Sequence, residues 1–195
     1  LTQGHFIKND LKKAITEGEN YMRSYPNSKN VKEIYRILGN SYNREHDTNT
    51  SISYYEKYLQ LAEKPLAQDM YMLGTSYYIT GKYQKAIDAL KYAASTNDKL
   101  GQAAYMELGQ AYLKVNDSPN TLMAFDAASR VNFDPAVSEA ALYNYALLTH
   151  QTSLSVFDQS ITALQRFLKE YPNSKYANQV LDILATTFLS TKNYN

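Results

Sequence analysis

The residues best suited to acid–base or metal chemistry are few and widely separated in this chain of 195 residues. The three histidines are His5, His46 and His150, and none has a second ligand or a nucleophile at a useful spacing. His46 stands between Glu45 and Asp47, and a solvated turn between two helices explains that cluster. The histidines therefore predict neither a catalytic centre nor a metal site.

Other catalytic patterns are also absent from the sequence. Glu17 and Glu19 are two residues apart, so their carboxylates would point to different faces of a helix. There is no cysteine, which excludes disulfides and thiolate metal ligands. There is no glycine-rich phosphate loop, no Ser-x-x-Lys and no His-Glu-x-x-His motif. We therefore expect that the chain is not an enzyme and has no catalytic residues, no metal and no cofactor.

The composition favours an all-helical protein and argues against nucleic-acid binding. The 20 Lys and Arg residues balance 19 Asp and Glu residues, giving a net charge of +1, whereas a protein that binds the phosphate backbone needs a concentrated basic face. No apolar run approaches the roughly 18 residues of a membrane-spanning helix, so we expect no direct membrane insertion in this segment. Only 7 Gly and 5 Pro residues interrupt the chain, and so few helix breakers indicate an all-α fold.

The string Leu-Gly-x-x-Tyr occurs three times at a fixed interval. It begins at Leu38, Leu73 and Leu108, so each copy lies 35 residues after the last. A period of this size is typical of stacked supersecondary units. The string itself carries no chemistry, and we expect it to be a buried packing element of each unit.

The glycine in each copy needs a structural reason. Apolar residues at spacings of three and four place Gly39, Gly74 and Gly109 inside helices, where glycine costs about 0.5–1 kcal/mol relative to Ala. We expect the backbone of a neighbouring helix to approach closely at each glycine. Small residues such as Ala86 and Ala128 would form the matching recess in the second helix of the unit.

The residues within one period follow a recognisable order. A first helix has a large residue, Leu-Gly and Tyr; a second helix has a small and then a large residue, with Pro near the end of the unit. The large first residues are Tyr35, Met70, Tyr105, Leu142 and Leu181. This order resembles the tetratricopeptide repeat. The departures are the absence of Trp, the bulky Tyr58 and Phe167 at usually small positions, and Tyr145-Ala146 and Leu184-Ala185 in place of Leu-Gly.

The resemblance covers essentially the whole chain and implies an all-α fold. We expect a right-handed superhelical solenoid of antiparallel helix pairs, with about ten helices, in which neighbouring pairs stack into one continuous core. We expect one array over residues 1–195. Partial units at 1–30 and 176–195 would flank complete units at 31–65, 66–100, 101–135 and 136–175.

Both ends of the array suggest a piece of a longer repeat protein. In register, residues 1–8 fall where the tail of a preceding first helix should be, and Asn193 and Tyr194 fall where a second helix should begin. The last helix, with Leu181 and Phe188, has no second helix to complete its unit, although a natural array normally ends in a polar capping element.

The resemblance also implies a function and a surface. Proteins of this family bind protein segments on the concave face formed by the first helices of their units. Tyr and Met side chains on such a face bury area, and Arg and Asn hydrogen-bond a peptide backbone. The partner-binding residues expected here are Arg36, Asn40, Asn43, Arg44, Tyr71, Thr75, Tyr78, Met106, Gln110, Lys114, Tyr143 and Leu147. A half-exposed face of a scaffold would explain the same residues equally well.

One specialised form of this surface does not fit the sequence. Some chaperone-binding members hold a C-terminal carboxylate with a basic residue and Asn on one helix, Asn on the next and two basic residues on the third. Arg36 and Asn40 match the first pair. Met72 then stands in place of Asn, and Ala103 and Glu107 replace the basic pair. We therefore expect no carboxylate clamp.

The leading expectation is a non-catalytic scaffold with a protein or peptide partner, and two alternatives stay open. One is a structural or assembly module of a larger envelope protein that makes contacts through its edges and ends, including homo-oligomers through exposed repeat ends. The other is a domain of an enzyme whose chemistry lies elsewhere. The pentapeptide Tyr25–Lys29, identical to Tyr171–Lys175, resembles the closing turn of bacterial-envelope repeat proteins such as the Bam-complex lipoprotein and the Tol-Pal-associated periplasmic protein. It favours the periplasm or cell envelope over the cytoplasm.

Overall fold

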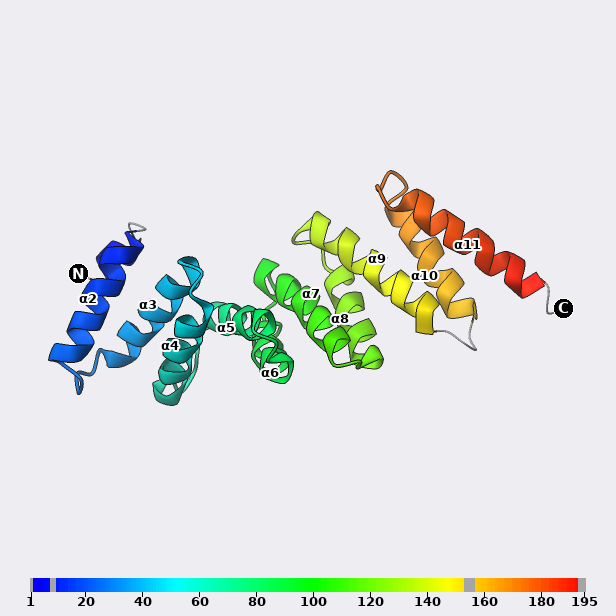
Figure 1. The fold of residues 1–195 in the computed structure, drawn as a ribbon. Helices are drawn as coiled ribbons and strands as arrows, with labels where there is room; N and C mark the ends of the chain where they lie inside the picture. The colour runs from blue at the N-terminus through cyan, green and yellow to red at the C-terminus, as the bar shows by residue number, and fades with distance from the viewer. Residues whose placement is uncertain (1, 8–9, 153–156, 193–195) are drawn as a thin grey trace. The chain divides into compact units, whose positions relative to one another are not determined.

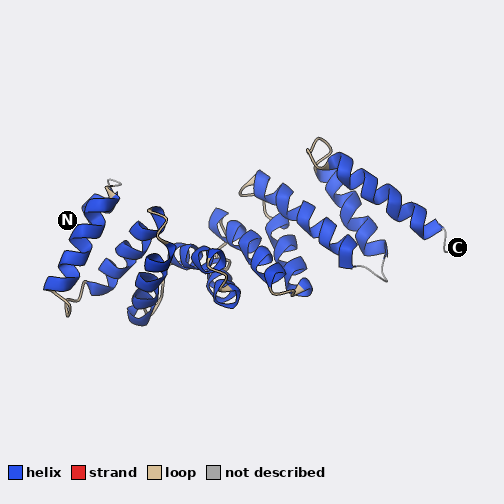
Figure 2. Ribbon diagram, viewed as in Figure 1, coloured by secondary structure: helices blue, strands red, loops and turns tan. Residues whose placement is uncertain are grey.

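The computed structural model describes residues 2–7, 10–152 and 157–192, and regular structure within these ranges is helical throughout (Figures 1 and 2). The chain divides into two compact units, Leu1–Thr96 and Asn97–Asn195. The prediction of an all-α fold of antiparallel helix pairs is confirmed. Within the described ranges there are eleven helices, against about ten predicted.

The described residues of unit 1 form six helices, and each packs on the next along the chain. The helix α1 also contacts α3, and α3 contacts α5, so alternate helices line one side of the unit. The helices are α1 (Thr2–Ile7), α2 (Leu11–Ser24), α3 (Val31–Arg44), α4 (Thr48–Leu61), α5 (Ala67–Ile79) and α6 (Tyr83–Ala93).

In unit 2 the residues that the structure describes form five helices with the same order of packing. Each helix contacts its successor, and α7 also contacts α9. The helices are α7 (Lys99–Lys114), α8 (Ser118–Arg130), α9 (Pro135–Thr152), α10 (Phe157–Glu170) and α11 (Ala177–Lys192).

Each repeated glycine faces a large side chain of the next helix. A β-carbon added at Gly39 would lie 3.0 Å from the ring of Tyr55, and one at Gly109 would lie 2.5 Å from the ring of Phe125. At Gly74 the neighbour is the Leu90 side chain, at 2.7 Å. The expected close approach therefore exists, but a side chain of the second helix makes it, and backbone approaches only at Gly74, where the Leu90 nitrogen would lie 3.3 Å away.

The turn between the two helices of a pair is also repeated. His46, Gly81 and Asn116 adopt positive φ angles of 62°, 74° and 58°. The next backbone N–H then donates to the carbonyl of the repeated tyrosine, as Asp117 does to Tyr112 at 3.0 Å. This arrangement satisfies carbonyls at the helix end. His46 thus lies in the turn between α3 and α4, where it adopts the positive φ angle that this turn requires.

Side-chain capping of the second helix differs between repeats. The Asp47 carboxylate accepts a hydrogen bond from the Thr50 N–H at 3.2 Å, and Asp117 accepts from Asn120 at the same distance. Lys82 holds the equivalent position before α6 and makes no side-chain cap hydrogen bond. Two of the three pairs therefore have a capped second helix.

The described end of α11 exposes apolar side chains. Leu181 is 50% exposed, Phe188 41% and Leu189 65%. The predicted start of a second helix at Asn193 and Tyr194 lies outside the described residues, as does the side chain of His5. In the part of the chain that the structure describes, no helix combines the length and the apolar character needed to cross a membrane.

Candidate protein-binding surfaces

The residues predicted to bind a partner fall into two sets, one in each unit. Unit 1 holds Arg36, Asn40, Asn43 and Arg44 on α3 with Tyr71, Thr75 and Tyr78 on α5; unit 2 holds Met106, Gln110 and Lys114 on α7 with Tyr143 and Leu147 on α9. Since α3 contacts α5 and α7 contacts α9, each set lies on two adjacent first helices of its own unit.

In unit 1 the two predicted asparagines bond to the neighbouring helix. The Asn40 side-chain amide donates to the Asp69 carboxylate at 3.0 Å, and the Asn43 amide donates to the Ser76 hydroxyl at 2.9 Å. Both amides therefore join α3 to α5 in the free protein. A partner that used them would have to compete with these bonds.

Arg36 is held in the same way by carboxylates. Its guanidinium makes a two-point hydrogen bond with Glu33, at 3.0 and 2.6 Å, and lies 3.7 Å from Asp69. The hydrogen bond with Glu33 raises the pKa of Arg36 further above its ordinary value. Arg36 keeps 22% of its side chain exposed, so its charge is already shared between two carboxylates.

Asp69 is a functional candidate that the sequence interpretation missed. It is 2% exposed, and burial raises the pKa of its carboxyl, although the Asn40 hydrogen bond and the Arg36 charge act in the opposite direction. One repeat earlier and later the same position holds Ile34 and Ala104. The sequence did contain a signal for Asp69, namely an acidic residue at a position that is apolar in the neighbouring repeats.

The remaining predicted residues of unit 1 differ in exposure. Tyr71, Thr75 and Tyr78 are half-buried on α5, and Arg44 is exposed at the end of α3. The Tyr78 ring meets the ring of Tyr83 edge-on, with centroids 5.6 Å apart. The two tyrosines on α5 thus offer partly exposed aromatic surface on the helix that also carries Asp69.

In unit 2 the predicted set is divided between packing and exposure. Tyr143 stacks on Tyr176 with ring centroids 4.0 Å apart, and its hydroxyl donates to the Gln179 side chain at 2.9 Å. Met106, Gln110 and Leu147 are half-buried, and Lys114 is exposed. Tyr143 also packs against Phe167 of α10, with ring centroids 5.8 Å apart, so it joins α9 to both α10 and α11. The exposed residues of this set lie mainly on α7.

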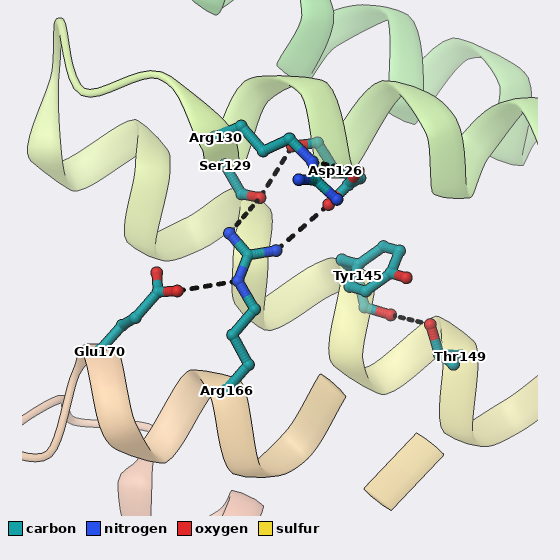
Figure 3. A network of polar contacts seen from close by, with 7 residues as sticks. All are labelled: Asp126, Ser129, Arg130, Tyr145, Thr149, Arg166 and Glu170. Carbon is teal, nitrogen blue, oxygen red and sulfur yellow. Dashed lines mark hydrogen bonds and ion pairs between the residues drawn. The ribbon is translucent and has the colours of Figure 1, made fainter. Parts of the chain in front are cut away.

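A salt-bridge network links α8 to α10 (Figure 3). Arg166 pairs with Asp126 at 3.2 Å and with Glu170 at 2.8 Å, and Arg130 pairs with Asp126 at 2.6 Å. The Ser129 hydroxyl lies 3.4 Å from the Arg166 guanidinium. Two arginines balance two carboxylates here, so the network ties helices together and leaves no excess charge for an ionic ligand.

Gln102, in unit 2, is a second buried polar residue that sequence analysis missed. It is 1% exposed. Its amide nitrogen donates to the Val131 carbonyl at 2.9 Å and the Ser138 hydroxyl at 2.8 Å, while its oxygen accepts from the Asp134 N–H at 2.7 Å. One side chain therefore organises the turn between α8 and α9.

His150 also has structural partners. Its Nδ1 lies 3.2 Å from the Ser160 hydroxyl and 3.4 Å from the Thr187 hydroxyl, which belong to α10 and α11. Among the residues whose positions are described, no group of three or more His, Cys, Asp or Glu side chains is placed to hold a metal ion.

Comparison with known proteins agrees with this geometry. Residues 140–174 match the family model for the tetratricopeptide repeat. No curated protein matches the sequence. The structure is similar to that of MamA (22% identity over 88% of this chain and 95% of MamA, TM-score 0.68). It is also similar to YrrB, described as a TPR protein with an unusual peptide-binding site (18% identity, 93% and 88% of the two chains, TM-score 0.72).

A third similar structure is a tetratricopeptide repeat protein from Parabacteroides merdae, with 17% identity over 98% of this chain and 71% of that protein and a TM-score of 0.65. At this identity the likeness concerns the fold. Residues 140–174 match the tetratricopeptide repeat, and the chain has a helical-repeat fold like that of tetratricopeptide repeat proteins.

Proposed function

We propose that the chain is a non-catalytic scaffold that binds a peptide or protein segment along the first helices of its units. The observation that carries this proposal is α5, which presents half-buried Tyr71 and Tyr78 on the same helix as Asp69, the carboxylate that pairs with Arg36 of α3. Aromatic side chains flanked by hydrogen-bonding groups are typical of sites that dominate binding energy. The peptide-binding site named for the structurally similar YrrB supports the same class of function.

The test is a pair of substitutions on α5 with a matched control. The double variant Tyr71→Ala/Tyr78→Ala should weaken binding of a co-purified protein partner by more than about 1 kcal/mol, or about fivefold in Kd. Ile79→Ala is the control, because Ile79 is 72% exposed and adjacent in sequence. Unchanged affinity of the double variant, with an unchanged melting temperature, would refute the role of α5.

A second function rests on the exposed apolar side chains of α11. In this alternative the chain is an assembly module of a larger envelope protein, and Leu181, Phe188 and Leu189 form a contact with another subunit or domain. Leu189→Ser would then reduce assembly, measured by sedimentation velocity, and leave binding through α5 unchanged. The proposed periplasmic location rests on the Tyr-Pro-Asn-Ser-Lys turn and is tested by fractionating cells that produce the full gene product.

A further inference from the structure

A polar cavity of about 440 Å³ lies in unit 2 where α8 and α10 end. Its walls come from the end of α8, the turn that follows it, the start of α9 and the last turns of α10. We call this cavity the α8–α10 groove. Its walls include Ser129, Arg130, Asn132, Arg166, Glu170 and Tyr171.

The corresponding place in unit 1 lies between α4 and α6. Tyr92 and Arg166 hold the same repeat position, because each follows the large buried residue of its helix, Leu90 or Leu164, by two positions. Both residues also stand near the end of their helix. What Tyr92 contacts in unit 1 therefore indicates what this position can bind.

In unit 1 the chain's own backbone lies at this place. Residues 62–66 connect α4 to α5, and both ends of this connection are extended, with ψ angles of 112° at Ala62 and 140° at Leu66. The Tyr92 hydroxyl donates to the Pro65 carbonyl at 2.9 Å. A side chain at this position of a second helix thus binds extended backbone.

In unit 2 the residue at this position has different partners (Figure 3). Arg166 pairs with Asp126 of α8 at 3.2 Å and with Glu170 of its own helix at 2.8 Å. Its guanidinium also lies 3.4 Å from the Ser129 hydroxyl. These contacts direct Arg166 to α8 and α10, whereas Tyr92 is directed to the connection before the next first helix.

The connection between α8 and α9, residues 131–134, is held by α7. The Gln102 amide donates to the carbonyls of Val131 and Asp134, at 2.9 and 3.3 Å. Because α7 holds this backbone, the cavity beside α10 is not filled by it. The α8–α10 groove thus has room at the place where unit 1 binds an extended segment of its own.

The walls of the groove decide which kind of segment fits. Two arginines balance two carboxylates in the network of Figure 3, so an ionic ligand would gain no net attraction. The Arg130 side chain is 68% exposed and can donate hydrogen bonds, and the Glu170 side chain is 40% exposed and can accept them. A peptide group has one N–H donor and one C=O acceptor, so uncharged extended backbone complements both.

We propose that the α8–α10 groove binds an extended, uncharged segment of a protein partner through the backbone of that segment, with Arg130 as donor and Glu170 as acceptor. The inference goes beyond the proposed function, because the groove belongs to α8, α9 and α10 of unit 2. Neither Tyr71 nor Tyr78 of α5 takes part in it.

The probe is a peptide of residues 61–67, the segment that lies at the corresponding place in unit 1, with both ends capped and with Glu63→Gln and Lys64→Gln to remove its charges. Nuclear magnetic resonance of the intact, nitrogen-15-labelled chain would follow its binding. We expect saturable shifts of the signals of Arg130 and Asn132. No saturable shift of these signals would overturn the proposal.

Charged versions of the same peptide test the ligand class. The peptides with Lys64→Glu alone and with Glu63→Lys alone should each bind about threefold more weakly than the uncharged peptide. Binding of the uncharged peptide should be the same in low and high salt, since screening acts on charges. Tighter binding of either charged peptide would assign an ionic ligand and refute the proposal. Shifts caused by maltotriose and not by the uncharged peptide would assign a saccharide and refute it as well.

Variants of the protein locate the binding. Asn132→Trp places a large ring in the groove and should abolish the shifts, whereas Met123→Trp adds the same ring at a 70% exposed position of α8 outside the groove and should not. Arg130→Ala should weaken binding about threefold, as expected for the loss of one hydrogen bond. Unchanged affinity of a folded Asn132→Trp variant would refute the groove.

One further variant separates this proposal from the function proposed for α5. Tyr71→Ala/Tyr78→Ala should leave binding of the uncharged peptide unchanged, even where it abolishes binding of a partner through α5. Loss of peptide binding in this folded double variant would place the peptide on α5 and overturn the α8–α10 groove. Asn132→Trp should in turn leave binding through α5 intact.

Discussion

The Gly109 α-carbon lies so close to Phe125 that a β-carbon there would approach the ring to 2.5 Å. Phe125 is itself 2% exposed, so its ring has little room to move. The same relationship joins Gly74 to Leu90. This pair of contacts explains why glycine, a poor helix former, is repeated inside the first helices.

Gly109→Ala should therefore destabilise the protein although Ala is the better helix former. We expect a loss of about 1–3 kcal/mol from overpacking, measured as a lower midpoint in urea unfolding. Adding Phe125→Leu should recover part of the loss, since it removes the ring atoms that clash. Gly4→Ala is the control, because nothing lies within 4 Å of its added β-carbon. A neutral Gly109→Ala would show that the α7–α8 contact relaxes freely.

Lys82→Asp should stabilise unit 1. It would give α6 the N-cap that Asp47 and Asp117 give to α4 and α8, for a gain of about 0.5–2 kcal/mol in free energy of unfolding. The Lys82 ammonium lies 5.9 Å from the Tyr77 ring centroid, so Lys82→Ala measures what its removal alone costs. The gain relative to Lys82→Ala should disappear below about pH 4, where the new carboxylate is protonated. No gain at pH 7 would mean that the α6 start cannot adopt cap geometry.

Gln102→Leu should destabilise unit 2 strongly. The substitution leaves the Asp134 N–H without its Gln102 acceptor, at a cost of about 1–3 kcal/mol. The Val131 carbonyl loses the Gln102 amide but keeps the Ser138 hydroxyl as a donor. Thermal unfolding followed by circular dichroism would detect the loss. Gln110→Leu on the half-buried face of the same helix is the control and should change stability little. If both variants unfold at the same temperature, the turn between α8 and α9 does not depend on the amide.

Asp69→Asn should stabilise unit 1 at neutral pH. Burial raises the folded-state pKa of Asp69, so ionised Asp69 opposes folding, and this cost is relieved as pH falls through the folded pKa towards the unfolded value of about 3.9. The variant should be more stable at pH 7, and the gain should shrink towards pH 4. A less stable variant at pH 7 would show instead that attraction to Arg36 outweighs desolvation.

Much of the fold could be predicted because its signals are local. The period of Leu38, Leu73 and Leu108 placed the helix pairs, and the glycines marked their close contacts. The atoms that contact each glycine were only partly predicted. A repeated glycine indicates a close contact, but it does not indicate whether backbone atoms or a side chain such as the Tyr55 ring make that contact.

The candidate surfaces were predicted less completely. Asn40, Asn43 and Tyr143 were assigned to a partner, and the structure bonds them to Asp69, Ser76 and Gln179. Position in a repeat tells which helix a residue occupies. It does not tell whether a neighbouring helix already satisfies that residue's hydrogen bonds.

The sequence by itself determined the helices and the phase of the repeats, because spacings of three and four and the Leu-Gly-x-x-Tyr string act within one or two turns of helix. Only the tertiary structure decided which polar groups are satisfied and where space remains. Gln102 and Asp134 are 32 residues apart in sequence, and Arg130 and Glu170 meet at one cavity only because α8 and α10 both pack on α9. Such relations depend on how separate helices pack, and no local pattern records them.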